Sequence, residues 1–127
     1  MEIIIHQIHP DKSVNTDDKI AEVIADEIII KNVQNALDLL ASVFHKEANS
    51  IILYEKNITP DFFNLKTGLA GEVLQKFVNY NFKLSIIGEF SKYNSNSLNS
   101  FIIECNRGNC FFFANNINEV SEKMNLH

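Results

Sequence analysis

Ser50-Ile51-Ile52-Leu53-Tyr54 is a short, continuously apolar segment in the middle of the chain. Its side chains do not alternate between apolar and polar, a pattern typical of a strand buried on both faces of a parallel sheet. A polar connection leads on to residues 67–71, Thr-Gly-Leu-Ala-Gly, where an apolar stripe with helical spacing begins. A buried strand that feeds a helix is the repeating unit of α/β domains, so this segment indicates that class.

The same alternation extends along the chain on both sides of this unit. β-branched and aromatic runs predict further strands at residues 2–8, 20–24, 84–88 and 110–113, and helical spacing predicts helices at residues 33–44, 98–108 and 117–124. Residues 27–30 fit a strand or a helix, and a turn at Ala25-Asp26 would make them a hairpin partner of residues 20–24. We therefore expect a single α/β domain over residues 1–127. It should have a mainly parallel or mixed sheet of about five strands, about four or five helices, and an antiparallel pair near the N-terminus.

Several residues predict where the helices begin and end. Asn32 is placed to cap the helix that follows it, and Asn116 with Glu119 three residues later matches a capping box. The Ser/Asn-rich residues 91–97 predict a loop before the next helix. That helix is expected to end at Gly108, in the left-handed conformation that glycine adopts most easily.

The composition narrows the range of partners. The net charge is −5 and Arg107 is the only arginine, so no Lys/Arg stripe for a phosphate backbone is expected. No apolar run approaches the roughly 20 residues that cross a bilayer, and the first residues lack the features of a secretory signal. We expect a cytoplasmic protein that contacts neither nucleic acid nor membrane. Cys105 and Cys110 are too sparse for a disulfide scaffold and are expected to be free thiols.

Residues 66–74 and the strand at residues 84–88 look like the central signature of STAS domains, the bacterial anti-sigma-factor antagonists. In that family a buried strand leads to an Asp-Ser-Ser/Thr-Gly-Leu turn that opens a helix, and the helix, strand, helix order of the last third is similar too. The resemblance implies a STAS-like fold and a switch in which a phosphorylated serine controls partner binding. Leu65 and Lys66 stand where the family has its aspartate and that serine. Thr67 keeps the next hydroxyl and is the candidate phosphoacceptor, because a phosphate there would add about −1.5 to −2 charges at a helix N-terminus.

A closer likeness spans nearly the whole chain. The chain resembles a bacterial family of unknown function, numbered 4180 among such domains, at Leu39, Phe62-Phe63, Leu65, Thr67-Gly68-Leu69-Ala70-Gly71-Glu72, Gln75-Lys76-Phe77, Tyr80, Gly88 and Asn106-Arg107-Gly108. This resemblance implies membership of that family and implies no activity.

The residues around the predicted helix start form the candidate partner or ligand surface. They are Phe62, Phe63, Lys66, Thr67, Gly68, Glu72 and Lys76, joined by Arg107 from a later helix. Adjacent aromatics such as Phe62 and Phe63 are not expected to enter a core together from one short turn. Exposure of one of them as a partner anchor is therefore weighed equally against burial.

Structural explanations compete with these functional ones. Thr67 is better explained as a helix N-cap than as a phosphoacceptor, and Arg107 as a cation that offsets a helix dipole than as an anion ligand. Glu72 and Lys76 fit a surface ion pair four residues apart better than an acid/base set with Glu104. His6 and His9 would face opposite sides of a strand, so no metal site is expected.

Three functions remain, in decreasing order of support. The first is a non-enzymatic regulatory or protein-binding module that contacts a protein partner through the surface from Phe62 to Lys76, without a cofactor; a homodimer is left open. The second is a sensor of a small anionic ligand or nucleotide held by Thr67, Gly68 and Arg107. The third is an enzyme, which ranks lowest because the sequence holds no convincing catalytic set.

Overall fold

The computed structural model describes residues 1–7 and 19–124 of the 127-residue chain. Its strands are β1 (Glu2–Gln7), β2 (Lys19–Ile24), β3 (Ser50–Tyr54), β4 (Lys83–Ile87) and β5 (Phe111–Ala114). Its α-helices are α1 (Val33–Phe44), α2 (Leu69–Asn79), α3 (Asn96–Arg107) and α4 (Ile117–Met124). Short 3₁₀ turns occupy Glu55–Asn57, Pro60–Phe63, Leu65–Thr67 and Phe90–Tyr93.

The strands form one sheet in the order β1-β2-β3-β4-β5. β1 is antiparallel to β2, whereas each neighbouring pair from β2 to β5 is parallel. Parallel neighbours need crossover connections, and α1, α2 and α3 supply them between successive strands. The mixed five-stranded sheet and the four helices of the described residues confirm the predicted α/β class, and the antiparallel pair lies near the N-terminus as expected.

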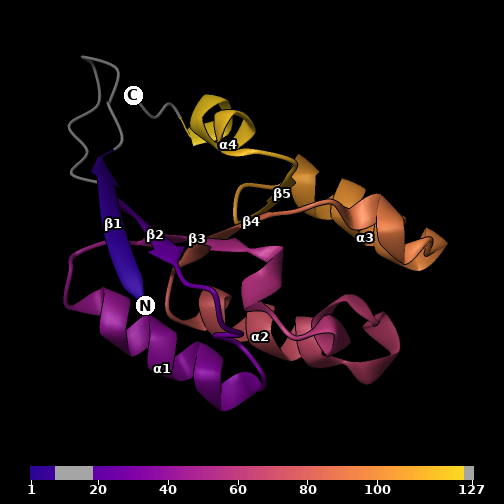
Figure 1. The fold of residues 1–127 in the computed structure, drawn as a ribbon, viewed down its shortest axis with the longest axis horizontal. Helices are drawn as coiled ribbons and strands as arrows, with labels where there is room; N and C mark the ends of the chain where they lie inside the picture. Colours follow the sequence, from indigo (N-terminus) through magenta and orange to yellow (C-terminus); the bar gives the residue numbers. More distant parts are fainter. Residues whose placement is uncertain (8–18, 125–127) are drawn as a thin grey trace.

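The helices cover the two faces of the sheet unequally. α1 and α2 lie on one face and α4 lies on the other (Figure 1). The alternation of side chains along β3 explains both layers, because Ile51 and Leu53 enter the large core beneath α1 and α2, whereas Ile52 enters a small core with Val120 of α4. Leu98 of α3 belongs to the large core. β3 is therefore buried on both faces, as its continuous hydrophobicity predicts.

The hairpin that a turn at Ala25-Asp26 would form between residues 20–24 and 27–30 is not present, and residues 27–30 are neither a regular strand nor a helix. β2 pairs with β1 instead, and residues 27–30 bend away toward α1. The Asn57 side chain explains the difference, since its amide donates to the backbone carbonyls of Ala25 at 2.9 Å and Glu27 at 3.0 Å. These bonds hold the segment after β2 against the end of β3, so it does not return along β2.

The predicted helix caps are present, with one shift of partner. The Asn32 side chain accepts the backbone N–H three residues later at 2.9 Å, and the Asn116 side chain accepts that of Glu119 at 3.0 Å. In a capping box the Glu119 carboxylate would accept the N–H of Asn116. Here it accepts the N–H of Asn115 at 2.8 Å instead.

Two other predicted boundaries differ. The predicted loop at residues 91–97 is largely ordered, because the turn Phe90–Tyr93 and the first residues of α3 occupy most of it. Gly108 ends α3 with φ −88°, so it is not in the left-handed region. The Gly108 N–H donates to the Cys105 carbonyl at 3.0 Å, and this closing turn explains why an ordinary backbone conformation suffices.

Candidate functional site

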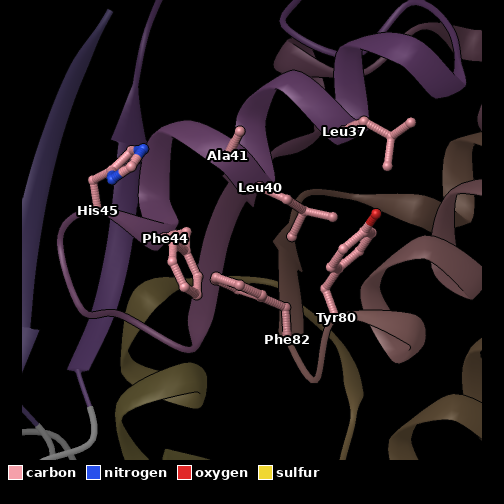
Figure 2. Close-up of a pocket in the computed structure, with 7 residues that line it drawn as sticks. All are labelled: Leu37, Leu40, Ala41, Phe44, His45, Tyr80 and Phe82. Atoms are coloured by element: carbon pink, nitrogen blue, oxygen red, sulfur yellow. The ribbon is translucent and has the colours of Figure 1, made fainter.

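An open apolar pocket of about 450 Å³ lies between the second half of α1 and the turn after α2. Its lining consists mostly of aliphatic and aromatic side chains: Leu37, Leu40, Ala41, Phe44, His45, Tyr80 and Phe82. Figure 2 shows the Tyr80 ring across from Leu37 and Leu40. The same view shows the Phe44 ring beside Phe82. Phe44 is 69% exposed and Tyr80 is 61% exposed, so the pocket presents aromatic surface to solvent.

The helical period explains why α1 exposes apolar side chains here. Leu40 and Val43 are buried in the large core. Ala41 and Phe44 come one position later, about 100° further round the helix, and are exposed. The apolar stripe of α1 is thus wider than the core it covers, and its excess width forms one wall of the pocket.

The end of α2 explains the opposite wall. Asn81 adopts a left-handed conformation with φ 59°, and the N–H of Phe82 donates to the carbonyl of Phe77 at 2.8 Å. This tight reversal buries Phe82, which forms the floor of the pocket, and leaves the Tyr80 ring projecting from the last turn.

The seam between α1 and α2 continues from this pocket to a charged end. A second depression there is lined by Val33, Gly71, Glu72, Gln75 and Lys76. Val33 lies one helical turn before Leu37, and Lys76 one turn before Tyr80, so the two depressions follow each other along the same pair of helices. We call the two together the α1–α2 groove. The ion pair predicted between Glu72 and Lys76 is absent from the described residues, and neither side chain has another ion-pair partner there.

Gly71 lies in the floor of this charged end. It is exposed within a regular helix, where glycine costs about 1 kcal/mol relative to alanine. A Cβ added to Gly71 would meet no atom within 4 Å, so nothing else in the described chain requires a glycine there. The glycine leaves α2 open to close approach from outside.

Phe62 and Phe63 are both buried, so the proposal that one of them is exposed as an anchor is wrong. The 3₁₀ turn Pro60–Phe63 points both rings inward, with ring centroids 5.1 Å apart. Phe63 also stacks on Tyr93 at 5.0 Å, which places it under the loop that precedes α3. The assumption that one short turn cannot bury two adjacent aromatics fails because the core extends beneath this turn.

Thr67 and Gly68 are exposed at the start of α2, as predicted, but their roles differ. Gly68 is the N-cap, in the left-handed conformation with φ 77°. The Thr67 hydroxyl lies within hydrogen-bonding distance of the Asp61 and Asn64 carbonyls, at 2.8 and 2.9 Å, and accepts the Leu69 N–H at 3.2 Å. Thr67 therefore ties the preceding loop to the first residue of α2 from the position before the N-cap.

Arg107 and Lys66 lie at opposite ends of α3. Arg107 is in the last turn, with its guanidinium 3.7 Å from the Glu104 carboxylate. Lys66 lines a pocket of about 400 Å³ together with Ser95 and Ser97 at the first turn. A helix of 12 residues is about 18 Å long, so the fold does not bring Arg107 to the residues around the start of α2.

A partly buried carboxylate that no sequence pattern indicated lies beside the pocket that contains Lys66. Glu55 follows β3, and its carboxylate accepts the Tyr93 hydroxyl and forms an ion pair with Lys92 at 2.7 Å. Burial and then the hydrogen bond to Glu55 raise the pKa of Tyr93. Gly88 is needed here, because its Cβ would lie 2.6 Å from that of Glu55. No sequence spacing signals this cluster, since it joins the ends of two strands.

A second polar cluster, also missed, lies at β1 and β2 on the sheet face that carries α4. The buried Glu22 carboxylate accepts from the His6 ring at 2.8 Å and from the Tyr54 hydroxyl at 2.5 Å. Burial first, then the bond to Glu22 and its negative charge, raise the pKa of Tyr54 to about 12. The predicted strand position of His6 is correct, whereas His9 and His127 lie outside the described residues.

The remaining candidates do not assemble into a site. Cys105 and Cys110 are free thiols, and burial raises the pKa of Cys105. Within residues 1–7 and 19–124, no three His, Cys, Asp or Glu side chains come together as a metal site requires. Over the same ranges no helix is long and apolar enough to span a bilayer.

Comparison with known proteins identifies the family without adding an activity. No curated protein and no solved structure matches the chain. The STAS-like label therefore stays a prediction. The family described as a domain of unknown function, DUF4180, matches residues 15–124, which include every element from β2 to α4. On this match the chain belongs to the DUF4180 family.

Proposed function

We propose that this domain is a non-enzymatic protein-binding module whose partner inserts an amphipathic helix into the α1–α2 groove. The observation that carries the proposal is the open apolar pocket with two largely exposed aromatic rings, Phe44 and Tyr80. Aromatic residues at the centre of a pocket are the residues that most often dominate the free energy of protein binding.

The shape of the groove favours a helix as the occupant. α1 and α2 are both crossover helices between parallel strands, so they run in the same direction, and they lie side by side with the seam between them. A third helix bound along such a seam contacts it through side chains three and four residues apart. An antiparallel helix would also oppose the dipoles of α1 and α2 favourably.

The two ends of the groove specify the chemistry of that helix. Its apolar side chains would fill the pocket between Leu40, Phe44 and Tyr80. One helical turn further on, an acidic side chain would meet Lys76 and a basic one would meet Glu72, which have no ion-pair partner in the described chain. Gly71 would let the backbone of the partner approach α2 closely.

The test compares a groove variant with a matched surface variant. Tagged wild-type protein, Phe44→Ala/Tyr80→Ala and Ile103→Ala would each be used to recover partners from the native host, and binding of each recovered partner would then be measured with purified components. Ile103 is an apolar residue of α3 that is 55% exposed and does not line the groove. Each aromatic truncation is expected to weaken binding by about 2 kcal/mol.

A partner that binds the groove variant as tightly as the Ile103→Ala control would contradict the proposal. Turnover of a metabolite by the purified protein would contradict its non-enzymatic part. Both aromatic side chains are exposed, so the groove variant should unfold at the same urea concentration as the wild type.

The pocket of about 400 Å³ that is lined by Lys66, Ser95 and Ser97 supports an alternative function, a sensor of small anions. It lies beside the carboxyl ends of the parallel strands, where open α/β sheets bind ligands, and Lys66 is in its lining. A thermal-shift screen of inorganic phosphate and nucleotides against wild type, Lys66→Ala and Arg107→Ala tests it. This alternative requires a shift that Lys66→Ala abolishes and Arg107→Ala keeps, and the lack of any shift would rule it out.

A further inference from the structure

Strand β1 stands at the margin of the sheet, and among the described residues it pairs with β2 on one side only (Figure 1). Alternate backbone N–H and C=O groups of an edge strand point outward and can pair with another strand. Ile4 and Ile5, which point to opposite faces of β1, are 39% and 40% exposed. Residues 2–7 pair with β2 in unbroken register and contain no proline or lysine, so β1 carries none of these common edge guards.

The opposite edge of the sheet is protected. The Asn106 side chain, at the end of α3, accepts the backbone N–H of Phe113 at 2.8 Å and donates to the backbone carbonyl of the same residue at 3.1 Å. One amide group thus occupies the bonds that a neighbouring strand would make at the middle of β5. The described chain provides no such cap for β1.

The sequence of β1 is complementary to itself in the antiparallel direction. When two copies of Glu2–Gln7 are aligned antiparallel about Ile4, Ile4 faces the partner's Ile4, and Ile3 faces the partner's Ile5. In the same register Glu2 faces the partner's His6. Isoleucine pairs on both faces and a carboxylate opposite an imidazole are favourable cross-strand pairs. A strand with an acidic residue at each end would instead place two like charges opposite each other.

We propose that two copies of this chain pair edge to edge through β1, antiparallel and about a two-fold axis at Ile4. The five-stranded sheets then form one continuous sheet across the dimer. This inference goes beyond the proposed function, because it uses the β1 edge and leaves the α1–α2 groove free.

The surroundings of β1 support this contact. Glu22 holds His6 on the face where the partner's Glu2 would arrive, so the imidazole would lie between two carboxylates. On the other face a depression of about 140 Å³ beside β1 is lined by Met1, Ile29 and Leu39, with polar side chains of α1 around it. This depression gives the partner a second place to pack beyond the strand itself, which a strand contact alone needs for stability.

A charge test at the axis distinguishes this dimer from any other. Ile4→Lys or Ile4→Glu places two like charges face to face, whereas an equimolar mixture of the two variants places opposite charges there. By sedimentation equilibrium, we expect a wild-type dimer, a dissociation constant raised about a hundredfold in each single variant, and dimers recovered in the mixture. Ile103→Lys, on α3, is the matched control and should dimerise as the wild type does.

A monomeric wild type at all accessible concentrations, an unchanged dimer in Ile4→Lys, or a mixture as monomeric as its components would overturn the proposal. Ile4 lies opposite Glu22 of β2, so Ile4→Glu should unfold at a lower urea concentration than Ile4→Lys. Circular dichroism and urea unfolding at low concentration identify the conditions in which both variants are folded, and the dimers are compared there. Phe44→Ala/Tyr80→Ala should remain dimeric, so loss of partner binding in that variant and loss of the dimer are separate results.

Discussion

The two edges of the sheet are treated in opposite ways. β5 is four residues long and is capped at Phe113 by the Asn106 side chain, whereas β1 is six residues long, rich in isoleucine and uncapped in the described chain. The fold therefore has the means to close an edge with one amide group. An edge left open, apolar and self-complementary is better explained by a strand that pairs with it than by chance.

A covalent test of the strand register probes the open β1 edge most directly. Ile4→Cys, made together with Cys110→Ser, would place two thiols on the two-fold axis with Cα atoms about 4.5–5.5 Å apart, within disulfide reach. We expect a disulfide-linked dimer on mild oxidation, seen by non-reducing electrophoresis. Ile24→Cys in the same background is the control, because Ile24 is similarly exposed but lies one strand inward. Equal cross-linking of both variants would mean random collision.

The cap on β5 is tested by Asn106→Ala. This change removes both side-chain bonds to Phe113 and leaves a partly buried N–H and C=O without partners, at a cost of about 2–3 kcal/mol of unfolding free energy. With two open edges the protein should also form species larger than a dimer, visible by light scattering. Asn99→Ala removes an exposed amide from the same helix and should change neither quantity. A stable Asn106→Ala variant would show that the cap contributes nothing.

The contrast between the edges also shows what the sequence can reveal. Hydrophobic residues that recur every 2 or every 3.6 positions predict the strands and helices, because the buried face of each element is visible in its own sequence. The role of Asn106 is not predictable in that way, although Asn106-Arg107-Gly108 belongs to the family-like pattern, because its partner Phe113 lies seven residues later on another element. Glu22 is missed for the same reason, as its partners are 16 and 32 residues away.

The candidate site was predicted less well than the fold, and α1 shows why. Phe44 fits the helical stripe with Leu37 and Leu40, so periodicity assigns it to the core. Whether the last residue of a stripe is covered depends on how far the neighbouring helix reaches, and α2 ends where Tyr80 turns outward. Phe62 and Phe63 show the opposite case. One of these adjacent residues was expected to be exposed as often as buried, and both are buried in the core. Glu72 and Lys76 of the predicted partner surface line the groove, and the use of this surface by a partner stays a prediction.

The Glu22 cluster beside β1 has a pH signature that the β5 edge lacks. Burial and the bond to Glu22 raise the pKa of Tyr54 to about 12, above the ordinary value of 10.0 expected in the unfolded chain. The protonated phenol therefore stabilises the fold fully below pH 10, and this contribution is lost as the pH rises from about 10 to about 12. Urea unfolding of Tyr54→Phe should show a smaller alkaline decline than the wild type and a loss of about 1 kcal/mol at pH 7.

Tyr80→Phe is the matched variant for that measurement, because it removes an exposed hydroxyl without a hydrogen bond in the described chain and should keep the wild-type free energy at pH 7. An alkaline decline of the same size in Tyr54→Phe and wild type would show that the hydrogen bond from Tyr54 to Glu22 does not stabilise the fold.

The smallest expected effects come from two glycines at the start of α2, and they test the groove without changing either edge of the sheet. Gly71→Ala should stabilise the protein by about 0.5–1 kcal/mol, because alanine favours the helix and its Cβ meets no neighbour. Gly68→Ala should destabilise it by about 1 kcal/mol, since φ 77° strains any side chain there. Neither change touches β1 or β5, so sedimentation should show an unaltered dimer, while the added methyl group of Gly71→Ala should weaken a helix bound in the groove. A Gly71→Ala variant that is more stable and binds its partner as tightly as the wild type would show that no partner backbone approaches α2 closely at Gly71. That result would remove one argument for the α1–α2 groove as the binding site, and it would leave the argument for the β1 edge unchanged.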